Sequence, residues 1–268
     1  MIMVLEATHS EERGAAAPLD NAPVLSLRGI VKTFGSHQAL RGVDLDIRAG
    51  ECIGLIGDNA AGKSTLSKVM SGTYIPDEGT IQMGGRQIRF ANPSDARAQN
   101  IEMVYQDLAL CDHVDVVGNL FLGRELKRGP FLDQARMLRE AERMLAALEI
   151  RIPRLTAKVE KLSGGQRQAI AIARAASFEP KVLIMDEPTS ALAVAEVEAV
   201  LALINRIKAR GVAVVLVTHR MQDLFRVCDR VAVMYEGTKV AERQIEETNL
   251  QELVDLIVGK GAADGNLH

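Results

Sequence analysis

A glycine-rich segment ending in lysine, serine and threonine constrains the fold of this chain more than any other part of its sequence. The segment, 57–65, matches the pattern G-x-x-x-x-G-K-[ST] of phosphate-binding loops, which follow a strand and open a helix. Here an apolar run, 51–56, reads as a buried strand, and 64–70 reads as a helix. In such a loop, backbone N–H groups and the helix start point towards phosphate oxygens. The sequence therefore predicts a nucleotide-binding α/β fold, with phosphate-binding residues Gly57, Asp58, Asn59, Ala60, Ala61, Gly62, Lys63, Ser64 and Thr65.

Four side chains have distinct predicted roles towards the phosphates of a nucleotide and Mg²⁺. Lys63 brings positive charge to the β- and γ-phosphates, and the Ser64 hydroxyl is a ligand for Mg²⁺. An apolar run, 182–185, reads as another buried strand and is followed directly by Asp186 and Glu187. Ligands bind at the carboxyl ends of the strands in parallel sheets. We therefore predict that Asp186 holds the Mg²⁺ shell and that Glu187 orients and polarises the attacking water.

Short apolar strands alternate with amphipathic helices along most of the chain. We expect strands at 24–30, 43–47, 182–185, 212–217 and 230–235, and helices within 138–148, 197–204 and 250–257. This alternation indicates a parallel sheet with crossover helices. The stretch from about 94 to 178 departs from it and is predicted to be an inserted helical subdomain. One domain, 24–258, is thus expected between a disordered tail at 1–23 and a loose tail at 259–268.

Charge and composition argue against several classes of protein. The 32 basic and 35 acidic side chains give a formal net charge of -3, so no basic field is available for a nucleic-acid backbone. Aromatic residues make up 3% and tryptophan is absent, which leaves few side chains on which bases could stack. Cys52, Cys111 and Cys228 match no metal or redox motif. We recognise neither a signal peptide nor the run of about 20 apolar residues that a membrane span needs.

A second anion-binding site is predicted at the start of a helix that runs through Arg174. The sequence there is LSGGQ, from Leu162 to Gln166. A serine hydroxyl, N–H groups without intrahelical acceptors and the positive end of the helix dipole together favour an anion, although no lysine is present. The predicted residues of this site are Ser163, Gly164, Gly165 and Gln166.

Taken together, these motifs resemble the ATP-binding cassettes of ABC transporters, whose signature is LSGGQ, over residues of about 24–258. The resemblance implies a P-loop NTPase core with a parallel sheet, a small antiparallel β subdomain and an inserted helical subdomain. It further implies that Phe34 stacks on adenine, that Gln106 is a Mg²⁺ ligand linked to the helical subdomain, and that His219 reaches the γ-phosphate. Under this interpretation the catalytic residues are Glu187, His219 and Lys63.

The resemblance also implies an assembly. Two subunits would form a head-to-tail homodimer, in which the signature around Ser163 closes over the ATP held by the other subunit. Transmembrane permease subunits would bind the dimer at the cytoplasmic face of the inner membrane, and a periplasmic binding protein would deliver the transported molecule. No nucleic-acid partner is expected.

This chain departs from the family pattern at two positions. Ala60 stands where the family usually has glycine, and a positive φ there would cost about 1–2 kcal/mol. Ala193 stands where the family often has an aspartate that helps to couple the two nucleotide sites. We therefore expect less cooperativity between the sites than in relatives.

Other proteins with such cassettes fit the sequence less well. Lys63 and Ser163 are only 100 positions apart, without the long coiled coil of chromosome proteins or the zinc motifs of excision-repair proteins. Translation factors of this type carry two cassettes in tandem, and we find no internal repeat in this sequence. A regulatory GTPase would need an N-K-x-D motif, which is absent. A scaffold that does not hydrolyse ATP would be expected to lose Lys63 or Glu187.

The segments 104–110 and 119–125 resemble the ATPases of simple-sugar importers, the ribose, xylose and fructose group. This resemblance favours import of a simple sugar, and import of branched-chain amino acids stays open as the alternative. The segments also belong to the region expected to meet the permease.

Overall fold

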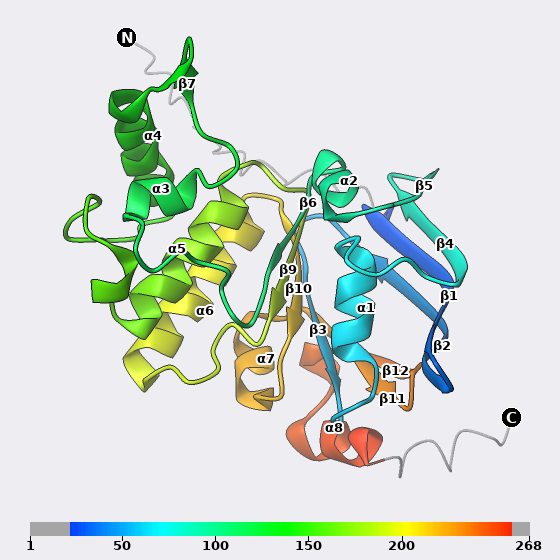
Figure 1. Cartoon of the computed structure of the whole chain (residues 1–268). Coiled ribbons are helices and arrows are strands. Elements are labelled where there is room, and N and C mark those ends of the chain that lie inside the picture. Colours follow the sequence, from blue (N-terminus) through cyan, green and yellow to red (C-terminus); the bar gives the residue numbers. More distant parts are fainter. Residues whose placement is uncertain (1–21, 259–268) are drawn as a thin grey trace, which may run out of the picture.

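The structure is a computed structural model and describes residues 22–258. Its main sheet has the strand order β12-β11-β3-β10-β9-β6 (Figure 1). All neighbouring strands are parallel except β12, which pairs antiparallel with β11. The strands are β3 (Cys52–Gly57), β6 (Ile101–Val104), β9 (Val182–Asp186), β10 (Ala213–Val217), β11 (Arg230–Tyr235) and β12 (Thr238–Gln244). The predicted parallel sheet with crossover helices is confirmed.

The central strands are almost entirely apolar because helices cover both faces of the sheet; only Asp186, at the end of β9, is charged. Every residue of β9 and β10 is buried. In Figure 1, α5 (Gly164–Ala176) and α6 (Val194–Ala209) lie on one side of these strands, and α1 (Lys63–Met70) lies on the other. A strand that is covered on both faces has no alternation of polar and apolar residues. This explains the uninterrupted apolar runs in the sequence.

A second, antiparallel sheet lies beyond α1, with the strand order β2-β1-β4-β5 (Figure 1). Its strands are β1 (Leu25–Phe34), β2 (His37–Ile47), β4 (Glu78–Met83) and β5 (Arg86–Ile88). Leu66 and Met70 of α1 belong to one buried cluster with Leu27 of this sheet and Ile53 of the main sheet. The helix therefore joins the two sheets, and the small antiparallel subdomain that the resemblance implied is present.

Shorter elements complete the fold. They are α2 (Pro93–Ala98), α3 (Val116–Leu120), β7 (Lys127–Arg128), β8 (Phe131–Leu132), α4 (Gln134–Ala147), α7 (Met221–Val227), α8 (Leu250–Ile257) and two 3₁₀ turns, η1 (Val159–Lys161) and η2 (Ile245–Glu247). The range 94–178, predicted as a helical subdomain, also contains β6, which pairs with β9 in the main sheet. The run Ile101–Val104 is at the lower limit of strand length and has neither strict alternation nor a continuous apolar sequence, so it was not recognised as a strand. The predicted tails, 1–23 and 259–268, lie outside the described residues apart from positions 22 and 23.

One arginine is buried where the two sheets approach each other. Arg230 of β11 is 1% exposed, and its guanidinium donates to Glu51 Oε1 at 2.6 Å and to Glu51 Oε2 at 3.0 Å. It also donates to the carboxylate of Glu242 on β12 and to the backbone carbonyl of Asp46 on β2. These bonds satisfy a buried charge, which would otherwise be strongly destabilising.

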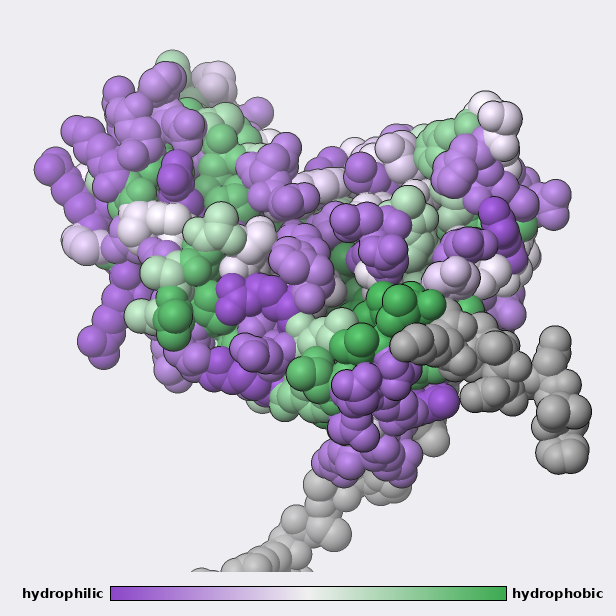
Figure 2. All heavy atoms as spheres, turned by 90° about the horizontal axis from the view of Figure 1, so that it is seen from below, coloured by the Kyte–Doolittle hydropathy of each residue, from purple (hydrophilic) through white to green (hydrophobic). Residues whose placement is uncertain are grey.

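The face of the molecule seen in Figure 2 is mostly hydrophilic, with hydrophobic side chains gathered near its middle. Figure 2 views the molecule from below Figure 1, and helix α8 lies at the bottom of Figure 1. Leu253 of α8 is fully buried, whereas Leu250 and the adjoining Val258 are 49% and 59% exposed. Across residues 22–258, no helix combines the length and apolar character that crossing a membrane requires.

Candidate functional site

Two glycines allow the segment between β3 and α1 to turn sharply against its neighbours. Gly57 has a φ of +150°, and a Cβ there would lie 2.2 Å from the carbonyl oxygen of Met234. Gly62 has a φ of +97°, and a Cβ there would lie 2.7 Å from the carbonyl oxygen of Ala39. Ala60 adopts a φ of +66°. This is the positive φ that, for an alanine in place of the usual glycine, strains the backbone. The loop thus keeps glycine at its two closest contacts but tolerates strain at one position.

Lys63 is the first residue of α1, and its side chain reaches back across the preceding loop. Its Nζ donates to the carbonyl oxygens of Gly57, at 2.9 Å, and Asp58, at 2.8 Å. Partial burial lowers the pKa of Lys63, and the negative charge of Glu187 opposes this effect. Because α1 begins at Lys63, the N–H groups of its first turn have no intrahelical acceptor and can bind an anion.

The two predicted carboxylates follow each other at the carboxyl end of β9. Asp186 is 8% exposed, and its pKa is raised by burial and by the neighbouring charge of Glu187. Glu187 has a φ of +52°, and its N–H donates to the carbonyl oxygen of Val217 on β10 at 2.8 Å. A non-glycine residue in the left-handed region is strained, and such strain is common at functional sites. The backbone here is therefore fixed by the neighbouring strand.

His219 lies beside Glu187, just after β10. Its Nδ1 is 2.7 Å from Glu187 Oε2, but the pair lacks the angles of a hydrogen bond, so this buried oxygen has no hydrogen-bond partner among the described residues. A buried carboxylate oxygen without a donor is costly, and a positioned water is a donor that could satisfy it. This geometry suits the water-orienting role predicted for Glu187.

Most of the predicted nucleotide-binding residues line one pocket of about 440 Å³. Its lining comprises Phe34, His37, Ala39, Asn59, Ala60, Ala61, Gly62, Lys63, Ser64, Thr65, Gln106, Asp186, Glu187, Val217 and His219. Gly57 and Asp58 take part through the two carbonyls that bind Lys63. The four signature residues, Ser163 to Gln166, do not line this pocket.

The oxygen atoms in this pocket fit Mg²⁺. Ser64, Gln106 and Asp186 offer a hydroxyl, an amide oxygen and a carboxylate, which are hard ligands of the kind that Mg²⁺ prefers. Within residues 22–258, no group of three or more His, Cys, Asp or Glu side chains could hold a metal. Magnesium usually takes only one or two carboxylates and fills its shell with phosphate oxygens and water, so a sparse donor set is expected.

An aromatic pair stands at the edge of the pocket. Phe34, at the end of β1, is 41% exposed and meets the ring of Tyr74 edge to face, with 5.1 Å between centroids. Lys32 Nζ lies 5.6 Å from the Phe34 centroid. An exposed ring face is available for stacking on a base. The sequence did not single out Tyr74 or His37, because neither belongs to a motif and only the fold brings them here.

The signature begins α5 and has its own carboxylate partner. Ser163 is the N-cap, and its hydroxyl accepts from the Gln166 N–H while the Gln166 side chain accepts from the Ser163 N–H. The Ser163 hydroxyl and the Gly165 N–H both donate to Glu196 Oε1, each at 2.9 Å. Glu196 belongs to α6 and was not predicted from the sequence.

The far end of α5 holds the segment that follows Gln106. Arg174 donates from Nη1 to the carbonyl oxygen of Ala109, at 2.8 Å, and from Nη2 to that of Leu108, at 2.9 Å. Leu108 and Ala109 both have positive φ values, and the two hydrogen bonds from Arg174 stabilise this tight turn. Helix α5 therefore carries the signature at its N-terminal end and binds the segment after Gln106 near its C-terminal end.

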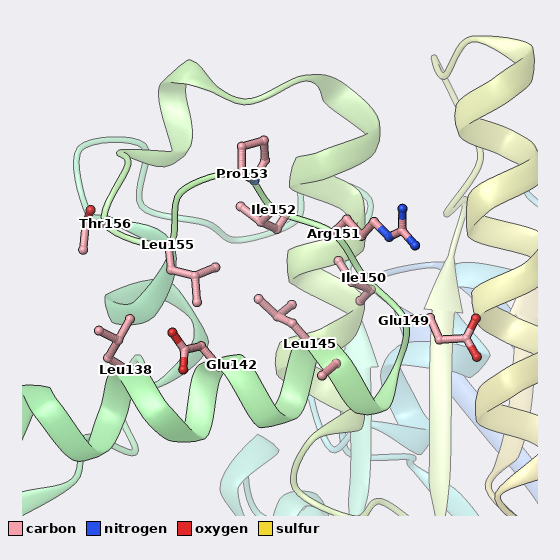
Figure 3. Close-up of a pocket in the computed structure, with 11 residues that line it drawn as sticks. Leu138, Glu142, Leu145, Glu149, Ile150, Arg151, Ile152, Pro153, Leu155 and Thr156 are labelled. Carbon is pink, nitrogen blue, oxygen red and sulfur yellow. The ribbon is translucent and has the colours of Figure 1, made fainter.

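A larger pocket, of about 940 Å³, lies between α4 and the segment 149–156. Figure 3 shows Leu145 of α4 and Leu155 of the facing segment pointing into it, with Glu142 beside them and Arg151 at one end. None of the residues predicted to bind nucleotide lines this pocket. Size alone therefore does not identify the candidate site, which is better identified by its charged groups and its strained backbone.

Comparison with protein families and known proteins gives a consistent result. Residues 40–190 match the family model described as ABC transporter. The chain is 42% identical over 244 residues to a xylose/arabinose import ATP-binding protein of Sulfolobus acidocaldarius, covering 91% of this chain and 97% of the relative. It is 41% identical over 245 residues to a fructose import ATP-binding protein of Rhizobium meliloti, covering 88% of this chain and 94% of the relative.

Other relatives are longer. A ribose import ATP-binding protein of Rubrobacter xylanophilus is 41% identical over 251 residues, which cover 93% of this chain but 48% of the relative. The chain thus spans about half the length of some relatives and nearly the whole of others.

Solved structures resemble this fold. An ATP-binding cassette of an ABC transporter superposes with a TM-score of 0.77 and 26% identity, covering 92% of this chain and 100% of the other. A dimeric cassette in a post-hydrolysis state, bound to ADP and Pi, superposes with a TM-score of 0.71 and 25% identity, covering 82% and 98%. With the loop, the carboxylates and the signature in place, this chain belongs to the family of ABC transporter ATP-binding cassettes.

Proposed function

We propose that this chain hydrolyses MgATP at the interface between two of its copies and thereby powers uptake of a simple sugar through a separate permease. The observation that carries the proposal is the division of the binding groups. Lys63, Asp186 and Glu187 surround one pocket, whereas the signature at Ser163 lies outside it. A site that lacks part of its anion-binding groups in one subunit is completed when a second subunit supplies them.

Hydrolysis follows from the groups in the pocket. Lys63 and the first-turn N–H groups of α1 bind the phosphate chain, and Phe34 contacts the adenine. Ser64, Gln106 and Asp186 would hold Mg²⁺, which neutralises charge on the β- and γ-phosphates. Glu187 orients the attacking water through its carboxylate, and His219, which lies beside Glu187 in the same pocket, contacts the γ-phosphate in this proposal. Loss of that phosphate removes a ligand shared by both subunits, so the dimer opens.

The sugar assignment is supported by relatives named as xylose/arabinose, fructose and ribose import ATP-binding proteins. We place the dimer on the cytoplasmic face of the inner membrane, bound to transmembrane permease subunits. A periplasmic sugar-binding protein is the third partner, which delivers the sugar to the permease. The segment 119–125 is proposed to lie against the permease.

The change Glu187→Gln tests the hydrolytic role. The variant should bind ATP as the parent does and lose turnover by about 100-fold or more, because the water loses its base while the phosphate-binding groups remain. Phosphate release measures turnover, and a fluorescent nucleotide measures binding. Lys63→Ala is the matched contrast, since it should weaken nucleotide binding itself. Near-normal turnover in Glu187→Gln would show that another group acts as the base.

Reconstitution tests the transported substrate. The chain would be placed in liposomes with the permease encoded beside it, and its ATPase rate measured with binding protein that is empty or loaded with pentose, hexose or leucine. We expect a pentose or hexose to stimulate the rate and leucine to have no effect. Stimulation by leucine alone would assign the chain to the branched-chain amino-acid importers.

A further inference from the structure

The carboxylate of Glu196 accepts hydrogen bonds from both the signature and the segment that follows the catalytic carboxylates. Its Oε1 accepts from the Ser163 hydroxyl and from the Gly165 N–H, both at 2.9 Å. Its Oε2 accepts from the Ala193 N–H at 3.2 Å. Two of the three donors are therefore groups that the signature would otherwise present to a phosphate.

Glu196 is also packed closely against the signature. A Cβ built on Gly165 would lie 2.7 Å from Glu196 Cγ and 2.8 Å from its Cβ and Cδ. Glycine at position 165 thus lets the carboxylate side chain lie directly over the first turn of α5. Such an approach would be blocked by any larger residue at this position.

The bound carboxylate is charged and can be reached from outside. The Gly165 N–H, followed by the Ser163 hydroxyl, lowers the pKa of Glu196, so the group is an anion at neutral pH. Glu196, Ser163 and Gly165 line a pocket of about 270 Å³ next to the segment 149–152. An approaching anion can therefore compete with Glu196 for the same donors.

We propose that Glu196 is a positioning residue that occupies the signature's anion-binding donors within its own subunit and is displaced by the phosphates of the partner's nucleotide. This inference rests on the proposed function, in which the signature binds ATP held by a second subunit. Glu196 keeps Ser163 and Gly165 ordered before the dimer closes. It also raises the ATP concentration that closure requires, because phosphate must first replace a charged acceptor.

The test uses the full chain with Glu187→Gln, in which hydrolysis is blocked, and measures the ATP concentration at half-maximal dimer formation by analytical ultracentrifugation. Adding Glu196→Gln should lower this concentration about fivefold, because a neutral amide competes less well for the donors than a carboxylate. In chains with native Glu187, Glu196→Gln should lower the KM for ATP by a similar factor. An unchanged or higher concentration would overturn the proposal, since a merely supporting residue would weaken closure when altered.

Glu198→Gln is the matched control. Glu198 is on the same helix and pairs with Arg226, away from the signature. This variant removes the same charge from α6 and should leave the ATP concentration for dimer formation unchanged. A shift equal to that of Glu196→Gln would mean that the charge of the helix, and not the contact with the signature, is responsible.

A second measurement separates this proposal from the proposed function. In monomers that carry Lys63→Ala, inorganic phosphate is titrated while the amide signal of Gly165 is followed by NMR. Glu196→Gln should make that signal respond at about fivefold lower phosphate concentration. Equal responses would reject competition by Glu196, even where ATP-dependent dimers form. Absence of dimers together with the expected NMR shift would reject the shared ATP site and keep the role of Glu196.

Discussion

Three positions in the candidate site have backbone or side-chain arrangements that a protein selected for stability alone would avoid. Glu187 and Ala60 adopt φ values of +52° and +66°, and Glu187 Oε2 is buried without a hydrogen bond. Asp186 is buried beside a like charge, which raises its pKa. All three lie in the pocket that also contains Lys63. The strain and the unsatisfied oxygen are therefore concentrated where ligand contacts can compensate for them.

The strain at Ala60 can be measured directly. Ala60→Gly should raise the free energy of unfolding by up to about 1 kcal/mol, because glycine removes the left-handed penalty but gains freedom in the unfolded chain. Urea unfolding of the nucleotide-free protein measures the change. Ala61→Gly is the control, since Ala61 is buried without a positive φ and its change should instead destabilise by about 0.5–1 kcal/mol. A loss of stability in Ala60→Gly would contradict the assigned strain.

Local sequence predicted the groups that belong to motifs and no others. The loop around Lys63 and the pair after β9 could be placed because their strands and helices are read from neighbouring residues. Tyr74, His37 and Glu196 could not, because each reaches its position only through contacts between distant elements. The roles of the predicted site residues stay predictions, which the variants above would check.

At the level of elements, the buried arginine of β11 links both sheets. Arg230 is held by Glu51, which precedes β3, by Glu242 of β12 and by a backbone carbonyl of β2. The charge and hydrogen bonds of its partners exceed the effect of burial and raise the pKa of Arg230. Arg230 therefore keeps its positive charge although it is buried.

Removing one member of this pair should be worse than removing both. Glu51→Leu leaves the Arg230 charge buried with fewer acceptors and should cost about 3 kcal/mol of unfolding free energy. Glu51→Leu combined with Arg230→Met should cost less than the single change, because no unpaired charge remains. A double-mutant cycle by urea unfolding measures this coupling. Additive losses would show that the two side chains act independently.

Elements with a strong pattern were predicted, whereas several short elements and edge strands without one, among them β4, β6 and β12, were missed. The buried strands β9 and β10 and the helix after the phosphate loop follow from apolar runs and a known motif. Strand β6 was assigned to a helical region, since four residues between helices carry no readable period. Its place at the sheet edge depends on pairing with β9, a contact between residues about 80 positions apart in the sequence.

The shared-site arrangement belongs to the scale of the whole molecule. A mixture of Lys63→Ala subunits with Ser163→Arg subunits forms heterodimers in which one site has both halves intact. If the subunits mix randomly and the sites act independently, about a quarter of the parental ATPase rate should return. Each variant alone should be inactive. No recovery, with heterodimers demonstrated by differential tagging, would argue that each subunit works by itself.

Helix α5 gives these distant groups a common mechanical element. It has 13 residues and is about 20 Å long. Ser163 caps its N-terminus, and Arg174, near its C-terminus, donates hydrogen bonds to two backbone carbonyls of the turn after Gln106. In the proposed dimer, the signature faces the nucleotide of the other subunit. A movement of the turn after Gln106 would be transmitted along this rigid helix to that signature, and the two nucleotide pockets would be coupled through displacement of α5 without direct contact.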